Sequence, residues 1–368
     1  MSISTVESGV GVDRVAVCAY TIPTDEPSSD GTLEWDSTTI VIAEVSAGGV
    51  VGLGYTYADV AAATLIDSKL AGVIEGRDPM AVEAIWRAMV DAIRNVGRPG
   101  VASMAIAAVD TALWDLKAKL LDLPLATLLG RFHDKVPLYG SGGFTSYSIE
   151  RLQQQLAGWV EQGIGAVKMK VGRDPDADAA RVRSAREAIG DADLMVDANG
   201  AYSPTQALAK AELFAEQGVI WFEEPVSSDD LEGLRLLRDR SPAGMAIAAG
   251  EYGYDLHYFR RMLEAGAVDV LQADVTRCAG ITELVRAGAL CQAWSVPFSA
   301  HTAPSIHAHA CCAIEPLMHC EYFHDHVRIE HMLFDGVLEP VGGALVPDLT
   351  RPGLGLELKR SDAARFQV

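Results

Sequence analysis

The chain has 368 residues, 49% of them hydrophobic and 22% charged, which suits a folded protein with one large and one smaller domain. Its net charge of −20 at pH 7 argues against nucleic acid or an anionic membrane as a partner, because both would be repelled. A small anionic substrate stays open, since a buried metal ion and lysines reverse the sign of charge locally.

Neither the apolar runs nor the cysteines indicate a membrane or an oxidising compartment. No stretch approaches the ~20 apolar residues that a membrane helix needs. The segment Met1 to Val12 lacks the charged-then-apolar order of a signal peptide. The six cysteines show no CxxC motif and no regular spacing, as is typical of reduced, buried residues. We therefore expect a cytoplasmic protein.

Residues 1–130 predict an α+β unit, which the family resemblance given below implies is a capping domain. Three apolar runs predict strands, over Val15–Tyr20, Thr38–Val45 and Val50–Tyr55. The last two flank Ala47-Gly48-Gly49, a hairpin signal. The segment Thr21–Trp35 is rich in Pro, Asp, Ser and Gly, which predicts a mobile loop. Helical patterns follow over Met80–Asn95 and Met104–Leu121.

From about Lys135 short apolar runs alternate with amphipathic helical patterns, which is typical of parallel strands with helical crossovers. Eight runs predict strands: Val136–Gly140, Ala166–Val171, Leu194–Asp197, Val219–Glu223, Ala246–Gly250, Val268–Ala273, Val296–Ala300 and Leu317–Glu321.

The predicted fold class is α/β: a modified (β/α)8 (TIM-type) barrel over residues 131–334, containing the active site, with the N-terminal α+β capping domain. Residues 335–368 are expected to pack back on the capping domain. A doubly wound open sheet is the alternative, disfavoured because no phosphate-cradling glycine motif follows the early strands.

Active-site residues of such a barrel lie at the carboxyl ends of its strands. The predicted ends carry Lys168, Lys170, Asp197, Asn199, Glu223, Glu251, Asp274, His301 and Glu321. One polar residue after a strand is ordinary, because strands end in polar loops. A succession of strand ends that all bear groups able to bind metal or move a proton is hard to explain by solvation alone.

Three carboxylates, Asp197, Glu223 and Glu251, end adjacent strands and can converge on one point. Hard oxygen ligands with room for substrate suit Mg²⁺, with Mn²⁺ as a substitute. Zinc would be expected to recruit imidazole or thiolate, and none occurs at these three ends.

Two lysines, Lys168 and Lys170, lie two apart on one strand and therefore face the same side. A free lysine is a poor base at neutral pH, and lowering its pKa by ~3 units costs roughly 4 kcal/mol. A second ammonium at ~6 Å, with an effective dielectric constant of ~20, supplies about 3 kcal/mol of that. We therefore predict that Lys168 lowers the pKa of Lys170, the base.

The residues His301 and Asp274 end neighbouring strands, where a carboxylate on one imidazole nitrogen fixes the tautomer and raises basicity. The remaining histidines that we weighed are expected to be structural: His257, His307, His309 and His319.

The helical run Ala105–Lys119, with Pro124-Leu125 and Leu128-Leu129-Gly130 after it, resembles the signature of the mandelate racemase and muconate lactonizing enzymes of the enolase superfamily. The family's base and metal motifs are matched in order by Lys168-Met169-Lys170, Asp197-Ala198-Asn199, Glu223-Glu224-Pro225 and Gly250-Glu251. The mandelate racemase branch is matched by Asp274, His301 and Glu321, and the similarity covers essentially the whole chain.

This resemblance implies a capping domain closing over a barrel, and a magnesium ion that holds a small-molecule carboxylate substrate. Enolase-superfamily sites pair a lysine or histidine base with Mg²⁺ to form an enediolate. Lys170 and His301 would lie on opposite faces of the substrate carbon. Glu321, expected to be protonated, would donate a hydrogen bond to the developing charge. A homo-oligomer, dimer or octamer, would be usual for the family.

Departures from the family's pattern narrow the activity. The sixth strand ends in Asp274 where muconate lactonizing enzymes and dipeptide epimerases carry a lysine, which argues against those activities. Candidate substrate-binding residues are Asn199, Tyr55 and His324. Polar residues beyond the strand ends, such as Arg277, are candidates for binding hydroxyls or a distal carboxylate.

The polar surroundings favour dehydration of a sugar acid to a 2-keto-3-deoxy acid, with Lys170 as base and His301 as acid. The same groups serve a 2-hydroxy-acid racemase or epimerase, or a sugar-acid lactone cycloisomerase. A non-catalytic binding protein on this scaffold is a remote alternative, since every predicted catalytic group is retained.

Overall fold

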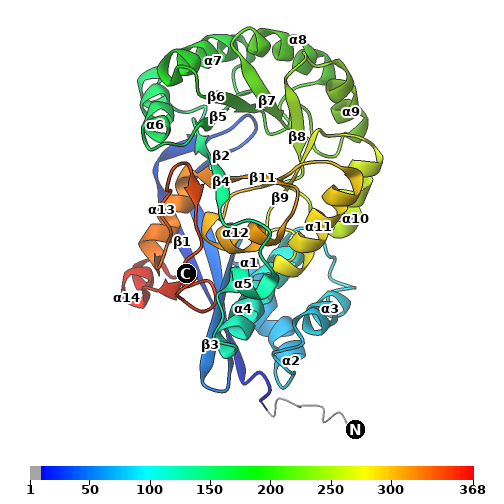
Figure 1. The fold of residues 1–368 in the computed structure, drawn as a ribbon, viewed down its shortest axis with the longest axis vertical. Coiled ribbons are helices and arrows are strands. Elements are labelled where there is room, and N and C mark those ends of the chain that lie inside the picture. The colour runs from blue at the N-terminus through cyan, green and yellow to red at the C-terminus, as the bar shows by residue number, and fades with distance from the viewer. Residues whose placement is uncertain (1–9) are drawn as a thin grey trace.

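A three-stranded antiparallel sheet, in the order β1-β2-β3, forms the lower part of Figure 1. Its strands are β1 (Arg14–Ser29), β2 (Glu34–Ala47) and β3 (Val50–Tyr57). The structure is a computed structural model that describes residues 10–368. The first part of the segment Met1 to Val12, in which no signal peptide was expected, lies outside the described residues. Gly48 and Gly49 adopt positive φ angles of 58° and 79° between β2 and β3, which confirms the predicted hairpin.

The prediction of a mobile loop over Thr21–Trp35 is wrong. Strands β1 and β2 continue through most of this segment, with Thr21 paired to Thr39, Pro23 to Ser37 and Ser28 to Trp35, and with an irregularity between Pro23 and Ser28. The prolines are accommodated because β1 is an edge strand, where a missing N–H leaves no ladder bond unmade.

Helices cover one side of this sheet: α1 (Ala61–Leu65), the π-helix η1 (Ile66–Leu70), α2 (Ala71–Ile74), α3 (Val82–Ala92), α4 (Val101–Leu120) and α5 (Leu125–Leu129). Helix α4 lies directly on β3, at Gly52 and Gly54. A Cβ atom on either glycine would lie 2.1 Å from a carbonyl oxygen of α4, so the close packing requires glycine at both positions.

Eight parallel strands form a closed barrel, because β11 pairs with β4 and completes the ring. The strands are β4 (Val136–Gly142), β5 (Ala166–Lys170), β6 (Asp193–Asp197), β7 (Val219–Glu223), β8 (Ala246–Ala249), β9 (Val270–Ala273), β10 (Phe298–Ala300) and β11 (Leu317–Phe323). This closure confirms the barrel and excludes the open sheet.

Helices follow the barrel strands: α6 (Ile149–Glu161), α7 (Pro175–Ile189), α8 (Pro204–Ala215), α9 (Leu231–Arg240), α10 (Leu256–Glu264), α11 (Ile281–Trp294), α12 (Pro304–Ala310) with η2 (Cys311–Ala313), and α13 (His324–Leu333). Helix α8 starts as its sequence indicates, with a capping box between Ser203 and Gln206 and with Pro204 in the first turn.

The tip of the β1–β2 hairpin reaches the rim of the barrel (Figure 1). The hydroxyl groups of Ser29 and Thr145 are hydrogen-bonded at 2.6 Å, and the amide of Thr145 donates to the carbonyl of Ser29. At the tip, a Cβ atom on Gly31 would lie 2.3 Å from the carbonyl oxygen of Ala198 and 2.8 Å from that of Val171. The hairpin is therefore seated on the loops that follow β5 and β6.

A residue of the capping domain accepts a hydrogen bond from a free backbone amide at the N-terminus of a barrel helix. Helix α11 begins after Gly280, which has no side chain to accept a hydrogen bond. The buried carboxylate of Asp110, on α4, accepts instead from the amide and the hydroxyl of Thr282, at 2.9 and 2.6 Å. The indole of Trp86 on α3 donates to the carbonyl of Ala279 beside it.

The C-terminal segment contacts both parts of the molecule. It contains β12 (Phe334–Asp335), β13 (Ala344–Leu345), β14 (Glu357–Leu358), α14 (Arg360–Ala363) and η3 (Ala364–Phe366). Strand β13 pairs with β4 of the barrel, and the amide of Val368 donates to the carbonyl of Ala19 in β1. The division of the chain at residues 130 and 334 stays a prediction.

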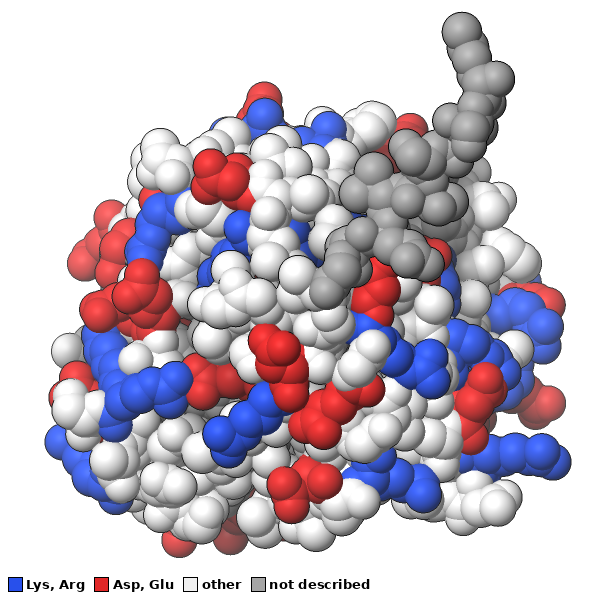
Figure 2. Space-filling view, turned by 90° about the horizontal axis from the view of Figure 1, so that it is seen from below, with Lys and Arg blue, Asp and Glu red and all other residues white. Residues whose placement is uncertain are grey.

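Two surface features bear on the expected partners. Among the described residues, no helix combines the length and the hydropathy needed to cross a bilayer. On the face seen in Figure 2, Lys and Arg side chains are interspersed with Asp and Glu side chains, and the described residues gather into no large basic patch there.

Candidate active site

Three carboxylates meet at the carboxyl end of the barrel. Asp197 ends β6, Glu223 ends β7 directly opposite it, and Glu251 follows β8. One oxygen of each lies within 4.8 Å of the others, and all three side chains are buried. The Oε2 atom of Glu251 accepts no well-aligned hydrogen bond, although His301 Nε2 lies 3.2 Å from it. A buried cluster of hard oxygen donors with such an atom fits a divalent cation of the Mg²⁺ type.

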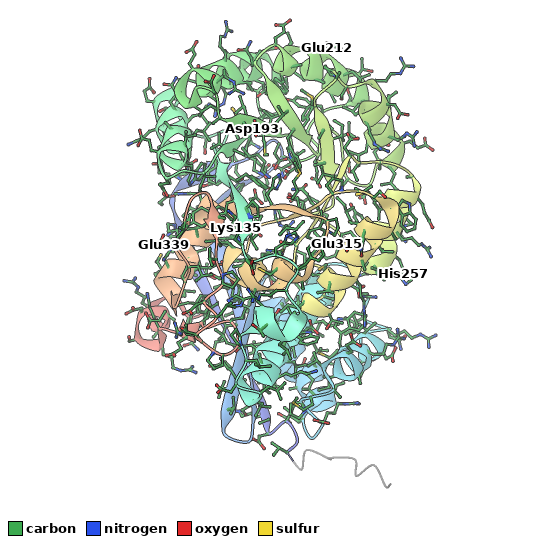
Figure 3. The ribbon with its side chains drawn as sticks, in the orientation of Figure 1. Lys135, Asp193, Glu212, His257, Glu315 and Glu339 are labelled. Atoms are coloured by element: carbon green, nitrogen blue, oxygen red, sulfur yellow. The ribbon has the colours of Figure 1, made fainter. Side chains whose placement is uncertain are left out.

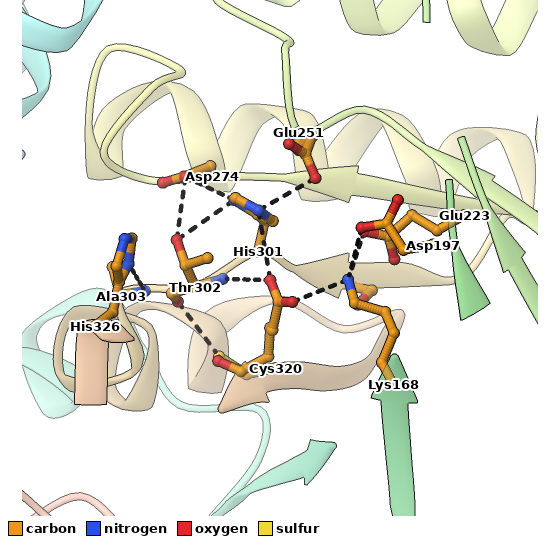
Figure 4. A network of polar contacts seen from close by, with 12 residues as sticks. Lys168, Asp197, Glu223, Glu251, Asp274, His301, Thr302, Ala303, Cys320 and His326 are labelled. Atoms are coloured by element: carbon orange, nitrogen blue, oxygen red, sulfur yellow. Dashed lines mark hydrogen bonds and ion pairs between the residues drawn. The ribbon is translucent and has the colours of Figure 1, made fainter. Parts of the chain in front are cut away.

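Both lysines of β5 point at this cluster, as their spacing predicts (Figure 4 shows Lys168). The Nζ atom of Lys168 lies 2.5 Å from Glu223 Oε1, 2.9 Å from Glu321 Oε1 and 3.6 Å from Asp197 Oδ2. The Nζ atom of Lys170 lies 2.5 Å from the same Asp197 oxygen. Both lysines are buried.

Lys168 lowers the pKa of Lys170, as predicted, but the net shift is upward for these contacts. Burial and the charge of Lys168 lower the pKa, and the carboxylates of Asp197, Glu251 and Glu321 together outweigh them. Lys168 compensates the charges of Glu223 and Glu321, and its own pKa is raised well above its ordinary value because these attractions outweigh burial.

The predicted pair of His301 and Asp274 is formed (Figure 4). The Nδ1 atom of the imidazole lies 2.8 Å from Asp274 Oδ2, and the other oxygen of Asp274 accepts from the amide and the hydroxyl of Thr276. The Nε2 atom of His301 lies 3.2 Å from Glu251 and 3.4 Å from Glu321. Burial would lower the pKa of His301, but the two glutamates and Asp274 raise it to about 10.

The prediction that Glu321 is protonated is wrong in this arrangement. Burial would raise the pKa of Glu321, but the positive charges of Lys168 and His301 lower it to about 2. The contacts of this side chain on β11 therefore favour the ionised form, and it accepts a hydrogen bond from the amide of Thr302 at 3.2 Å.

Above these groups lies a cavity of about 460 Å³ that both domains line. The barrel contributes Lys170, Asn199, Glu251, Tyr252, Arg277, His301, Thr302, Phe323 and His326. The capping domain contributes Asp30, Leu33, Trp35, Ser37, Thr38, Thr39, Tyr57, Ala58 and Asp59. Metal-binding, basic and acidic candidates thus face one space whose wall combines polar and apolar surface.

Of the three substrate-binding candidates, only Asn199 lines this cavity. Tyr55 does not: it is fully buried, and its hydroxyl donates to Glu330 at 2.6 Å. His324 lies outside the cavity, at the start of α13, and its Nε2 atom is 2.8 Å from Asp25 of the hairpin. Tyr57, two residues beyond Tyr55 on β3, lines the wall instead.

Sequence reasoning also missed the contribution of Thr38, Thr39 and Asp59 to the cavity. These residues lie near the ends of β2 and β3 that face the barrel, which no pattern in the capping domain alone identifies. Knowing that β1 and β2 continue beyond their apolar runs would have placed these residues beside the barrel.

The histidines expected to be structural lie away from the cavity. The Nδ1 atom of His307 is 2.7 Å from the carbonyl of Thr302, and Nδ1 of His319 is 2.9 Å from the hydroxyl of Ser299. His307, His309 and His319 are buried, whereas His257 lies on the outer side of α10 (Figure 3).

The chain matches two family models along most of its length. Residues 16–130 match the N-terminal domain of mandelate racemase / muconate lactonizing enzyme, and residues 151–363 match the enolase C-terminal domain-like model.

Individual proteins resemble the chain over almost its full length. A 3,6-anhydro-alpha-L-galactonate cycloisomerase of Streptomyces coelicolor is 33% identical, covering 97% of this chain and 99% of its own length. The L-talarate/galactarate dehydratase of Salmonella typhimurium is 32% identical, covering 98% of this chain and 91% of its own. A crystal structure of that dehydratase with Mg and L-lyxarohydroxamate superposes with a TM-score of 0.90, at 29% identity and with 100% of this chain and 95% of that chain covered.

A mandelate racemase/muconate lactonizing enzyme-like protein from Rubrobacter xylanophilus superposes with a TM-score of 0.96, at 60% identity, covering 97% of this chain and 100% of that structure. Fold, domain matches and motif order agree, and the chain belongs to the mandelate racemase/muconate lactonizing enzyme family of the enolase superfamily.

Proposed function

We propose that this chain is a Mg²⁺-dependent enzyme that removes the proton α to the carboxylate of a sugar acid and then expels the β-hydroxyl as water. The observation that carries the proposal is the pair of His301 and Asp274, which faces the same cavity as Lys170. An acid held by a buried carboxylate suits a poor leaving group such as hydroxide.

The carboxylates of Asp197, Glu223 and Glu251 would hold the metal ion. When bound, Mg²⁺ supplies positive charge that stabilises the extra negative charge of the substrate carboxylate after proton loss. Mn²⁺ shares the preference for oxygen ligands and is the expected substitute.

The side chains divide the remaining chemistry. With Asp197 engaged by the metal ion, the attraction that keeps Lys170 charged would weaken, and neutral Lys170 would accept the α-proton on Nζ. The electrons of the broken C–H bond move into the carboxylate as an enediolate. His301 gives the proton of Nε2 to the β-oxygen as the C–O bond breaks, so that water leaves. The resulting enol takes up a proton and becomes a 2-keto-3-deoxy acid. Asp274 keeps His301 in the orientation that this transfer needs.

The charges around His301 favour its role as a proton donor over a role as a base. Glu321 and Asp274, which are not assigned to the metal ion, both raise the pKa of His301 and so favour the protonated imidazole. A racemase that uses Lys170 and His301 as opposed bases needs the neutral imidazole for one of its two directions. A non-catalytic binding protein would have no use for a buried acid and base beside three carboxylates.

One relative favours a second candidate. The cycloisomerase of Streptomyces coelicolor is 33% identical over nearly the whole chain. If the β-oxygen belongs to a ring, the same proton abstraction and C–O cleavage open the ring without releasing water. Dehydration and ring opening would thus share the same side chains and differ only in substrate.

A panel of sugar acids, lactones and anhydro acids with Mg²⁺ tests the proposal. A product that is lighter by one water supports dehydration, whereas an isomeric 2-keto acid supports ring opening. In D₂O, we expect His301→Asn to retain α-proton exchange by Lys170 while losing dehydration. Inversion at the α-carbon without any keto acid across the panel would reject the proposal and favour a racemase.

A further inference from the structure

The two ends of the cavity differ in charge. Among the described residues that line the cavity, every lysine, arginine and histidine side chain lies at the barrel end: Lys170, Arg277, His301 and His326. The capping-domain end is lined by the carboxylates of Asp30 and Asp59, by hydroxyl groups and by the ring of Trp35. A ligand that spans the cavity therefore meets positive groups at one end only.

The cations of the barrel end already have carboxylate partners. Lys170 pairs with Asp197. Arg277 pairs with Glu251 at 3.1 Å, lies 3.6 Å from Asp274, and stacks over the ring of Tyr252. Burial lowers the pKa of His326 to about 3, which keeps this side chain neutral. With Glu251 assigned to the metal ion, Arg277 keeps Asp274 as a partner, so a second ligand carboxylate at this end would compete with Asp274.

The acids of the capping-domain end have no such partners. Neither Asp30 nor Asp59 forms an ion pair among the described residues; Asp30 accepts backbone hydrogen bonds from Thr32 and Leu33, and Asp59 accepts one from Ala61. The basic residues near the hairpin do not line the cavity and form ion pairs with other acids: Arg173 with Glu34, Arg151 with Asp25 and Glu26, and Arg328 with Asp325.

We propose that the substrate carries one carboxylate, at the metal end, and an uncharged polyhydroxyl tail against Asp30 and the hydroxyl groups of β2: an aldonate or its anhydro form, not an aldarate. Carboxylate and hydroxyl oxygens of the wall accept hydrogen bonds from the hydroxyl groups of such a tail. A second carboxylate would meet Asp30, which is 8% exposed and therefore weakly screened by salt. This inference rests on the proposed function for the placement of the first carboxylate.

Binding of matched acids tests the inference without relying on turnover. The Mg²⁺-saturated Lys170→Met variant, which should not convert its ligands, is titrated calorimetrically with D-gluconate against D-glucarate and with D-galactonate against galactarate. We expect at least one aldonate to bind about tenfold or more tightly than its aldarate. Added salt should change the gap little, because the buried Asp30 is weakly screened.

Charge-neutral variants test the wall itself. Asp30→Asn keeps the Oδ1 acceptor of the tip and should tighten aldarate binding about tenfold, while aldonate binding should weaken because the tail hydroxyl groups lose a charged acceptor. If Asp30→Asn does not fold because it disturbs the tip, Asp59→Asn is the second variant. Asp36→Asn, an equal charge change on β2 outside this cavity, should alter the binding of neither acid.

The outcomes separate the two proposals. Aldarates that bind as tightly as their aldonates overturn the inference, even if they are dehydrated and the proposed function stands. Tighter binding of aldonates, without conversion of any acid by the wild-type enzyme, supports the inference and rejects the proposed function.

Discussion

Tyr57 of the capping domain stacks on His326 of the barrel, with ring centroids 3.4 Å apart and 15° between the ring planes. Both residues line the cavity, so one continuous aromatic surface is shared by two parts of the chain that are far apart in sequence. The cavity wall exists only while the capping domain rests on α13. Residues that seat the capping domain should therefore affect substrate binding as strongly as residues that touch the substrate.

Metal dependence is the first expectation. Asp197→Asn removes one of three converging charges and should weaken Mg²⁺ binding by about tenfold or more, measured by calorimetry and by the rise in Tm on adding Mg²⁺. EDTA should abolish activity. Asp193→Asn, on the exposed start of the same strand, is the matched control and should bind metal normally. Full activity of metal-free enzyme would contradict the assignment.

The pair of His301 and Asp274 can be tested separately. Asp274→Asn should leave the circular dichroism spectrum unchanged but lower kcat by about 10²–10⁴, because the imidazole loses the group that orients and charges it. Thr302→Val removes a hydroxyl that also lies 3.2 Å from Asp274 and should cost less than about tenfold. Equal rates for Asp274→Asn and the wild type would show that the pair plays no part in catalysis.

Stability should depend on pH through Glu330. This fully buried carboxyl accepts hydrogen bonds from Tyr55 and Ser305, and burial, partly offset by these bonds, raises its pKa from 4.5 to about 7. The folded state then holds a proton that the unfolded state has lost, so stability is greatest below about pH 4.5 and falls as the pH rises to about 7. The shift corresponds to about 3 kcal/mol.

Urea denaturation of Glu330→Gln and the wild type at several pH values checks this expectation. Glutamine does not titrate, so the stability difference between the two proteins should move in favour of the variant between pH 5 and pH 8. A difference that is independent of pH would contradict the raised pKa.

Seating of the hairpin is the last expectation. Gly31→Ala places a Cβ atom 2.3 Å from the carbonyl of Ala198, so the tip should lift off the rim. We expect KM to rise about tenfold or more with little change in Tm, since the tip contributes little core. Gly72→Ala has nothing within 4 Å of its new Cβ and serves as the control. Unchanged KM in Gly31→Ala would show that the seated tip does not shape the cavity.

The barrel and the positions of its charged strand ends follow from the sequence because buried parallel strands alternate regularly with helices. The hairpin does not follow, since Pro23, Asp25 and Pro27 resemble a loop until their pairing with β2 is known. Tyr55 was misplaced for a similar reason. Tyr55 and Tyr57 share one face of β3, and the packing of α13, not the strand pattern, decides which of them reaches the cavity.

Protonation states are the part that residue identities leave open. Two lysines on one strand suggest that the two charges repel each other. In the structure each ammonium group pairs with a carboxylate, and the positive charge of Lys168 lowers the pKa of Glu321. These effects depend on distances of a few ångströms between residues from different strands. Spacing along one strand does not contain that information.

The cap that Asp110 places on α11 limits how the two domains can be recombined. Exchanging the capping domain for that of a relative is an obvious way to transplant substrate choice, since half of the cavity wall would move with it. The donor domain must then bring an acceptor at the position of Asp110. Otherwise the first turn of α11, a few residues beyond Asp274, loses the group that its own Gly280 cannot provide.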